Sequence, residues 1–123
     1  MANKPKIAGT DAETKVKRYA VERGWPHADR VTLSGGKDRG DIRLGDGIDF
    51  TIEVKGGQGA LKAPHSHLRE MTDERNNNGH RFGAVIAKKA GSTKVGDDWV
   101  AMMPVSMLFD IIDALYGFDN DQI

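Results

Sequence analysis

Hydrophobic and polar residues alternate most regularly between positions 48 and 55. The even positions of this run are apolar up to position 54 and the odd positions are polar, the period of a β-strand with one face in the core. Residues 41–44 alternate in the same way, and the Gly-Asp-Gly sequence at 45–47 between the two runs is typical of a tight turn. The pattern therefore predicts an antiparallel hairpin. Its polar face is expected to carry Asp41, Glu53 and Lys55.

The pattern around this hairpin predicts helices before and after it. Thr10 and Glu13 match a capping box, so a helix is expected from Thr10 to about residue 23. Further elements are expected as a strand at 30–33, a helix at 65–77, strands at 82–87 and 99–103, and a helix from 104 to about 117. The order α-β-β-β-α-β-β-α predicts an α/β fold, with a central mixed sheet flanked by helices.

The helix expected at 65–77 is strongly polar. Leu68 and Met71 give it a narrow apolar stripe. Its charged side chains, Glu70 and Glu74 among them, are expected to face water or a partner. The run at 82–87 is almost entirely apolar and is expected to be a central strand covered on both faces.

The length of 123 residues predicts a single domain spanning 1–123, with a mobile polar arm at 1–9 and an acidic tail at 116–123. No stretch of eighteen apolar residues is present, and the N-terminus lacks the apolar centre of a signal peptide, so the chain is expected in the cytoplasm. Because the sequence has no cysteine, oxygen or imidazole groups would have to hold any metal ion.

The formal net charge is zero, but the charges are unevenly distributed along the chain. Residues 1–43 contain ten Lys/Arg and six Asp/Glu, whereas residues 96–123 contain six Asp and no basic residue. A basic body with an acidic end is compatible with binding phosphates through one face, although charge runs are also common on solvated surfaces.

The acids and the lysine on the hairpin face form a candidate site for a divalent cation. Mg²⁺ prefers hard oxygen ligands, usually one or two carboxylates with water and substrate phosphate. A neighbouring lysine can orient or activate water and offset charge in a phosphoryl transition state. The alternative is an exposed hairpin face, on which Lys55 pairs with Glu53 or Asp41.

A glycine-rich basic loop at 34–40 precedes the hairpin. It lacks the Lys-Ser or Lys-Thr ending of a phosphate-binding P-loop. Its side chains Lys37 and Arg39 could contact a phosphate backbone, or the loop could be an ordinary surface turn.

Several motifs together resemble the PD-(D/E)xK nuclease superfamily and its αβββαβ restriction-endonuclease-like core. These are Asp-Arg-Gly-Asp-Ile at 38–42, Ile-Glu-Val-Lys at 52–55, Glu-Arg-Asn-Asn at 74–77, Gly-Ala-Val-Ile at 83–86 and Met-Pro at 103–104. The chain is most similar to Holliday-junction resolvases of the archaeal kind and to resolvase-like endonucleases of actinobacterial phages. The likeness covers about residues 9–115.

The resemblance implies a Mg²⁺ or Mn²⁺ ion held by Asp41, Glu53 and the backbone carbonyl of Val54. Lys55 would orient or activate the attacking water. Glu13 would complete the site or bind a second ion, a role that competes with its capping-box explanation. Arg30 and Ser34 stand where the resolvases contact the DNA backbone. Gly40 departs from the family pattern, which has proline before the first aspartate.

The implied activity is metal-dependent hydrolysis of DNA phosphodiesters in a homodimer, with Holliday junctions or other branched DNA as substrate. If the chain is phage-encoded, it would act in the host cytoplasm. The alternatives are a nuclease of the same fold that acts on flap, single-stranded or linear duplex DNA, and a catalytically silent DNA-binding module.

Overall fold

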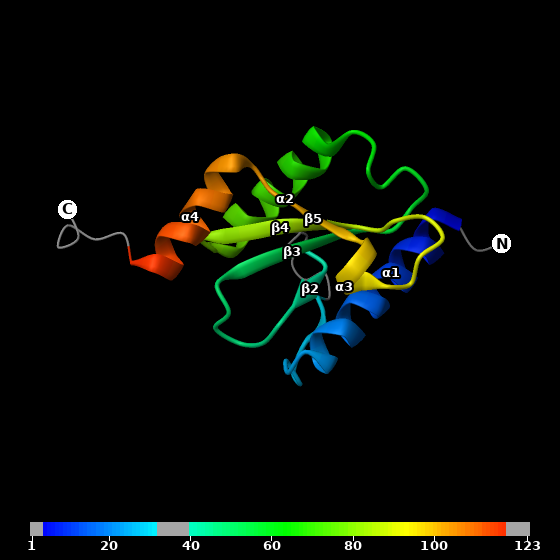
Figure 1. Ribbon diagram of the computed structural model, residues 1–123, viewed down its shortest axis with the longest axis horizontal. Helices are drawn as coiled ribbons and strands as arrows, with labels where there is room; N and C mark the ends of the chain where they lie inside the picture. Colours follow the sequence, from blue (N-terminus) through cyan, green and yellow to red (C-terminus); the bar gives the residue numbers. More distant parts are fainter. Residues whose placement is uncertain (1–3, 32–39, 118–123) are drawn as a thin grey trace.

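The computed structural model describes residues 4–31 and 40–117 of the chain. Three strands follow the first helix, and helices and strands alternate after them (Figure 1). They are α1 (Lys4–Glu22), β1 (Asp29–Arg30), β2 (Ile42–Arg43), β3 (Phe50–Lys55), α2 (Pro64–Asn78), β4 (Phe82–Ala87), α3 (Val95–Asp98), β5 (Val100–Met102) and α4 (Val105–Tyr116). The predicted α/β fold with a mixed sheet and flanking helices is confirmed.

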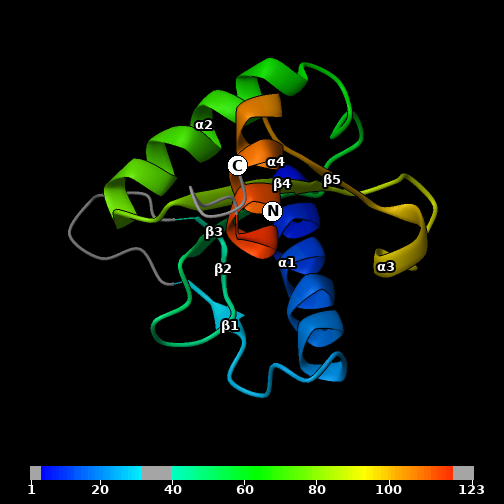
Figure 2. The same ribbon diagram turned by 60° about the vertical axis from the view of Figure 1, so that its left-hand side comes forward.

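The five strands form one sheet in the order β1-β2-β3-β4-β5. The predicted hairpin is present, because β2 pairs antiparallel with β3 through Ile42 and Ile52. β3 and β4 are parallel, and α2 forms the crossover between them, as two parallel neighbours require. The two views show α1 and α2 on opposite sides of the sheet (Figures 1 and 2).

The main hydrophobic core lies between α1 and the sheet. Ile52 and Val54 of β3 point into it, where they pack with buried side chains of α1 and with Trp99. Thr51 and Glu53, at the alternate positions of β3, are also buried, although they are polar. The predicted half-buried character of β3 is therefore wrong, because helices cover both faces of this strand. The prediction of a covered central strand at β4 is confirmed.

The first helix begins earlier than the sequence predicts. Residues 4–9 belong to α1, so the expected mobile arm is helical from Lys4 onward. Pro5 stands in the first turn, where its missing N–H removes no helical hydrogen bond. Thr10 lies inside the helix, and its carbonyl accepts a hydrogen bond from the Thr14 hydroxyl at 2.9 Å. The predicted capping box is therefore wrong.

The C-terminal half follows the predicted order closely. α4 ends at Gly117, which has a left-handed conformation with φ 60° and donates its N–H to the Asp113 carbonyl. The segment between the strands expected at 82–87 and 99–103 contains the short helix α3, which the sequence did not predict. Most of the expected acidic tail, 118–123, lies outside the described residues. Within 4–31 and 40–117, no helix has the length and apolar character needed to cross a membrane.

Candidate metal centre

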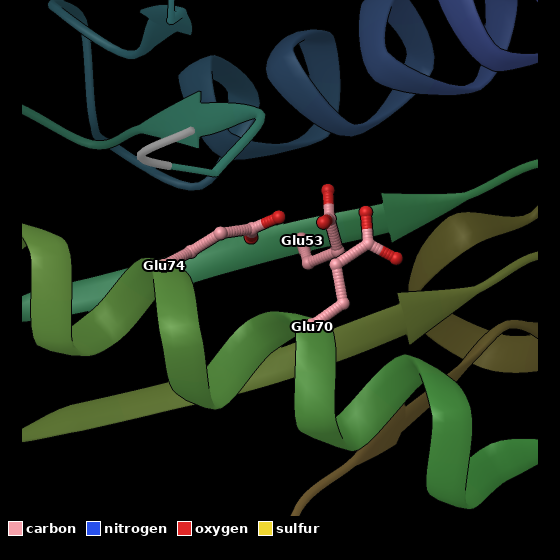
Figure 3. A group of neighbouring side chains, drawn as sticks. All are labelled: Glu53, Glu70 and Glu74. Carbon is pink, nitrogen blue, oxygen red and sulfur yellow. The ribbon is translucent and has the colours of Figure 1, made fainter. Parts of the chain in front are cut away.

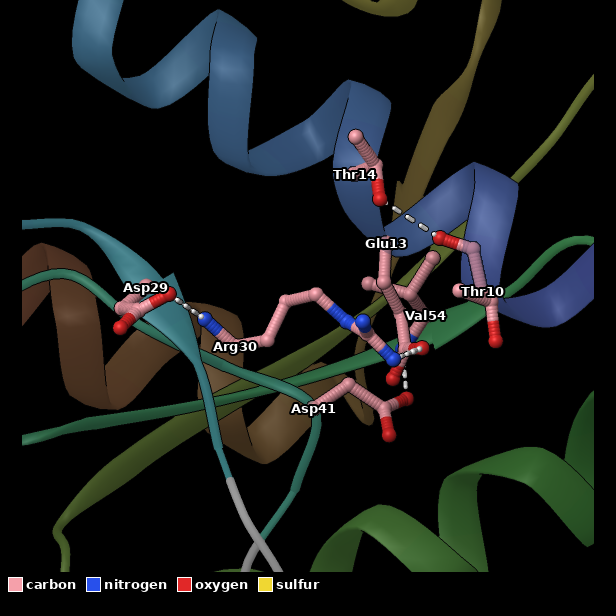
Figure 4. Close-up of polar contacts among 7 residues, drawn as sticks. All are labelled: Thr10, Glu13, Thr14, Asp29, Arg30, Asp41 and Val54. Atoms are coloured by element: carbon pink, nitrogen blue, oxygen red, sulfur yellow. Dashed lines mark hydrogen bonds and ion pairs between the residues drawn. The ribbon is translucent and has the colours of Figure 1, made fainter.

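Asp41 lies immediately before β2 and its carboxylate reaches across to β3. The Asp41 N–H donates to the Ile52 carbonyl at 2.8 Å, which continues the ladder between the two strands. The side chain then accepts a hydrogen bond from the Val54 N–H at 2.7 Å (Figure 4). The carboxylate thus satisfies a backbone donor of β3 just beyond the last paired residues of β2. This contact fixes Asp41 at the C-terminal half of β3, close to Glu53.

Gly40, the residue before Asp41, stands where the resemblance to the nucleases leads us to expect proline. Its φ is 94°, a conformation that proline cannot adopt. A Cβ atom here would lie 3.1 Å from the Ile52 carbonyl oxygen and 3.1 Å from the Thr51 Cγ2, so any larger residue would be strained. The same Cβ position is 3.7 Å from Glu74 Oε2. Glycine is therefore favoured here by its backbone conformation and by the close approach of β3.

Glu13 points from α1 toward Asp41 and the first strand. Arg30, on β1, donates from Nη2 to Glu13 Oε2 at 3.1 Å (Figure 4). The side chain of Glu13 is 16% exposed, and that of Arg30 is 44% exposed. Since Glu13 is not a helix cap, its position beside Asp41 has no local explanation within α1. The fold brings Glu13, Asp41 and Arg30 together from separate elements.

Burial and neighbouring acids disfavour ionisation of three carboxylates in this region. Burial raises the pKa of Glu13 to about 7, and Asp41 adds to this effect while Arg30 opposes it. Burial raises the pKa of Asp41 to about 8, helped by Glu53 and opposed by the Val54 N–H. The pKa of Glu53 rises to about 9, again mainly through burial, with the charges of Glu74 and Glu70 adding to it.

α2 contributes two further acids that sequence reasoning assigned to solvent. Figure 3 shows Glu70 and Glu74 pointing from α2 toward Glu53 on β3. One carboxylate oxygen from each of the three residues lies within 4.8 Å of the others. Glu74 is 1% exposed and Glu53 is 2% exposed. The prediction that these acids face water or a partner is therefore wrong for Glu74, whereas the Glu70 side chain is 42% exposed. The three carboxylates form a group that can hold a metal ion.

The sequence did contain a signal for this placement. Met71 belongs to the apolar stripe of α2 and is fully buried at 0% exposure. Glu70 precedes Met71 and Glu74 follows it by three residues, so both acids lie on or beside the face that Met71 turns to the sheet. An acid on or beside the apolar stripe of a helix is expected to be turned toward the core, where it contacts a residue of another element.

Lys55 lies at the end of β3 and is held by Glu70. Its Nζ donates to Glu70 Oε2 at 2.7 Å. Burial by itself would lower the pKa of Lys55, but the hydrogen bond to Glu70 and the charges of Glu53, Glu70 and Asp41 raise it above its usual value. The pKa of Glu70 is lowered. Burial by itself would raise it, but the hydrogen bond from Lys55 is the largest of the contacts that lower it. Lys55 is therefore a charged ammonium group in this arrangement.

The residues present fit a hard divalent cation. Oε2 of Glu53 is buried and has no hydrogen-bond partner among the described residues. A buried carboxylate oxygen without a partner costs several kcal/mol, whereas a cation would supply the missing contact. All the candidate ligand atoms of this centre are oxygens, the type that Mg²⁺ and Mn²⁺ prefer.

The site residues predicted from the sequence fall into two groups, those that the fold brings together and those outside the described residues. The fold brings Glu13, Arg30, Asp41, Glu53 and Lys55 into one region around the C-terminal half of β3. Ser34, Lys37 and Arg39, expected to contact DNA, lie at 32–39 and so outside the described residues. The role of the Val54 carbonyl as a metal ligand stays a prediction.

Comparison with known proteins gives no relative for this chain. No protein-family model, no curated protein and no solved structure matches it significantly. The likeness to PD-(D/E)xK nucleases therefore rests on the motifs of the sequence.

Proposed function

We propose that this protein is a metal-dependent DNA endonuclease with the restriction-endonuclease-like core of the PD-(D/E)xK superfamily. The observation that carries the proposal is the unpartnered Oε2 of Glu53, buried beside Asp41 and Lys55. These residues occupy the Asp, Glu and Lys positions of the family motif. A stability role does not account for them, because clustering buried acids costs free energy in the absence of a cation.

Asp41 and Glu53 are the proposed oxygen ligands, and the Val54 carbonyl and Glu13 are further candidates. A divalent cation bound there would polarise the scissile phosphate and lower the pKa of a bound water. The protein contributes orientation: the Val54 N–H fixes Asp41, and the position of Glu53 on a central strand covered on both faces fixes its side chain. Arg30 holds Glu13 beside Asp41.

Lys55 has a narrower role than the motif alone suggests. Because its pKa is raised, the side chain stays protonated at neutral pH and is a poor general base. Its ammonium group can donate a hydrogen bond to the attacking water or to a phosphate oxygen, and its charge offsets the negative charge that develops in the transition state.

The proposed substrate is DNA, with four-way junctions or other branched forms preferred. Purified protein should cleave DNA with Mg²⁺ or Mn²⁺ and should not cleave it in EDTA, because the site has only hard oxygen donors for the ion. The measurement is a panel of end-labelled junction, flap, single-stranded and linear duplex DNA at several Mg²⁺ concentrations. Preferred cleavage of the junction supports resolution, and preferred cleavage of another form assigns that substrate.

Absence of cleavage across the whole panel, together with DNA binding that does not depend on Mg²⁺, would instead identify a catalytically silent DNA-binding module. A matched control is the same panel with Ca²⁺, which also prefers oxygen ligands but has a larger and more flexible coordination shell. Binding without cleavage in Ca²⁺ would separate recognition from chemistry.

We further propose that the active form is a homodimer, because a four-way junction requires two symmetry-related cuts. The exposed apolar face of α4 supports this. Phe109 is 56% exposed and Leu115 is 72% exposed. Val105, Leu108, Ile112 and Tyr116 on the same helix are exposed as well. A second copy of the chain would remove this surface from water.

Sedimentation velocity tests the dimer. Wild-type protein is expected to sediment as a dimer, and Phe109→Glu is expected to shift it to monomer, since the substitution places a charge in the proposed interface. Asp113→Asn, a change at an exposed acid of the same helix, serves as the matched control. A wild-type chain that stays monomeric at tens of micromolar would contradict the dimer and junction resolution, while leaving a nicking activity possible.

A further inference from the structure

We infer that Glu70 and Glu74 form, with Glu53, a second divalent-cation position beside the one assigned to Asp41. This inference deepens the proposed function and rests on it, and it adds two ligands from α2 that the nuclease motif does not include. Glu53 would be shared by the two positions. Its test measures cation binding without DNA, so that it can fail separately from the proposed function.

The geometry supports a position between α2 and β3. Carboxylate oxygens of Glu53, Glu70 and Glu74 lie within 4.8 Å of one another, so that a single ion can contact all three. The side chains converge from two elements that pack directly against each other (Figure 3). Glu53 is only 2% exposed, its carboxylate lies among the three, and its Oε2 has no hydrogen-bond partner among the described residues (Figure 3).

The charges of this group also favour a cation. The three glutamates carry negative charge when ionised, and Lys55 donates a hydrogen bond to Glu70 Oε2 at 2.7 Å. A divalent cation would offset the mutual repulsion of the carboxylates. Arg30 pairs with Glu13.

Asp41 does not belong to the group of three. Its carboxylate accepts the Val54 N–H, and Glu13 and Glu53 are its acidic neighbours. The two sets of ligands therefore reach Glu53 from different elements: Asp41 and Glu13 from the hairpin and α1, Glu70 and Glu74 from α2. Two cations that share a carboxylate are the usual arrangement for stabilising both the attacking and the leaving oxygen in phosphoryl transfer.

The experiment counts bound Mn²⁺ on the full chain without DNA, by electron paramagnetic resonance and equilibrium dialysis. Wild type is expected to bind two ions per chain. The double variant Glu70→Gln/Glu74→Gln should bind one, and each single variant should weaken the second ion by about tenfold or more, as expected for loss of a ligand. Asp41→Asn should also bind one ion, because it retains the α2 position. Asp73→Asn, an exposed acid on α2, is the matched control and should bind two.

Thermal unfolding in EDTA shows whether the variants fold. Glu74→Gln should still unfold in one cooperative transition, because glutamine keeps the size and shape of the side chain. Mn²⁺ should raise its unfolding temperature less than that of wild type. A folded double variant that binds Mn²⁺ with wild-type stoichiometry and affinity would overturn the inference. The inference would also be overturned if wild type bound one ion and only Asp41→Asn lost it. That result would leave the proposed function intact. One ion lost only in the double variant would support the α2 position and contradict the Asp41 site.

Discussion

Asp41→Asn and Glu53→Gln are each expected to reduce metal-dependent DNA cleavage by on the order of a hundred- to a thousandfold. Both substitutions keep the shape of the side chain and remove its negative charge. The Asp41→Asn variant would no longer present an anionic ligand, although its amide oxygen can still accept the Val54 N–H, so the strand contact at 2.7 Å is preserved. The loss would therefore report on the cation and the chemistry, and not on the fold of the hairpin.

Single-turnover cleavage of the best substrate measures this effect, with thermal unfolding in EDTA as the test of folding. Asp46→Asn is the matched control, since Asp46 lies in the turn of the same hairpin with its side chain 99% exposed. Its cleavage rate should equal that of wild type. Wild-type rates in both Asp41→Asn and Glu53→Gln would remove the basis for the proposed centre.

The metal-free protein is expected to lose stability as the pH rises from about 5 to about 9. Glu13, Asp41 and Glu53 have folded-state pKa values of about 7, 8 and 9, whereas the unfolded chain releases these protons near pH 4. Between these limits the folded protein binds more protons than the unfolded chain. The free energy of unfolding therefore falls with rising pH, by an amount on the order of several kcal/mol in total.

The same three acids are faced by two basic residues, Arg30 and Lys55, and by the acids Glu70 and Glu74. The positive charges of Arg30 and Lys55 reduce the loss of stability at high pH without removing it. Mg²⁺ should restore much of the lost stability at high pH, since it binds the ionised carboxylates of the folded state.

Thermal unfolding by circular dichroism at pH 5, 7 and 9, in EDTA and in Mg²⁺, checks this prediction. Wild type in EDTA should unfold at a progressively lower temperature, and Glu53→Gln should show a shallower decline because one of the three titrating acids is gone. An unfolding temperature in EDTA that is constant or rises from pH 5 to pH 9 would contradict the raised pKa values.

Much of the architecture follows from local pattern. The alternation on either side of the turn at 45–47 predicted the β2–β3 hairpin, and the apolar run at 82–87 predicted a covered strand, because the spacing of apolar residues reflects which backbone faces can be buried. Pro104 and Gly117 correctly bounded α4, since each has a backbone preference that acts within one turn of helix.

The prediction of α1 from its capping box shows the limit of such rules. The Thr10 and Glu13 spacing is compatible with a cap, yet the helix extends back to Lys4 and frees Glu13 to contact Arg30. A local motif could not decide this, because the partner of Glu13 is seventeen residues away in the sequence.

The sequence by itself determined the order of the elements apart from the short helix α3, and it placed Asp41, Glu53 and Lys55 on one hairpin face. Only the tertiary structure decided that this face is buried and that α2 turns Glu70 and Glu74 toward it. The physical reason is that periodicity shows which side chains share a face of one helix or strand, whereas the parallel β3–β4 crossover determines which faces meet. A polar hairpin thus became a buried group of carboxylates suited to divalent cations.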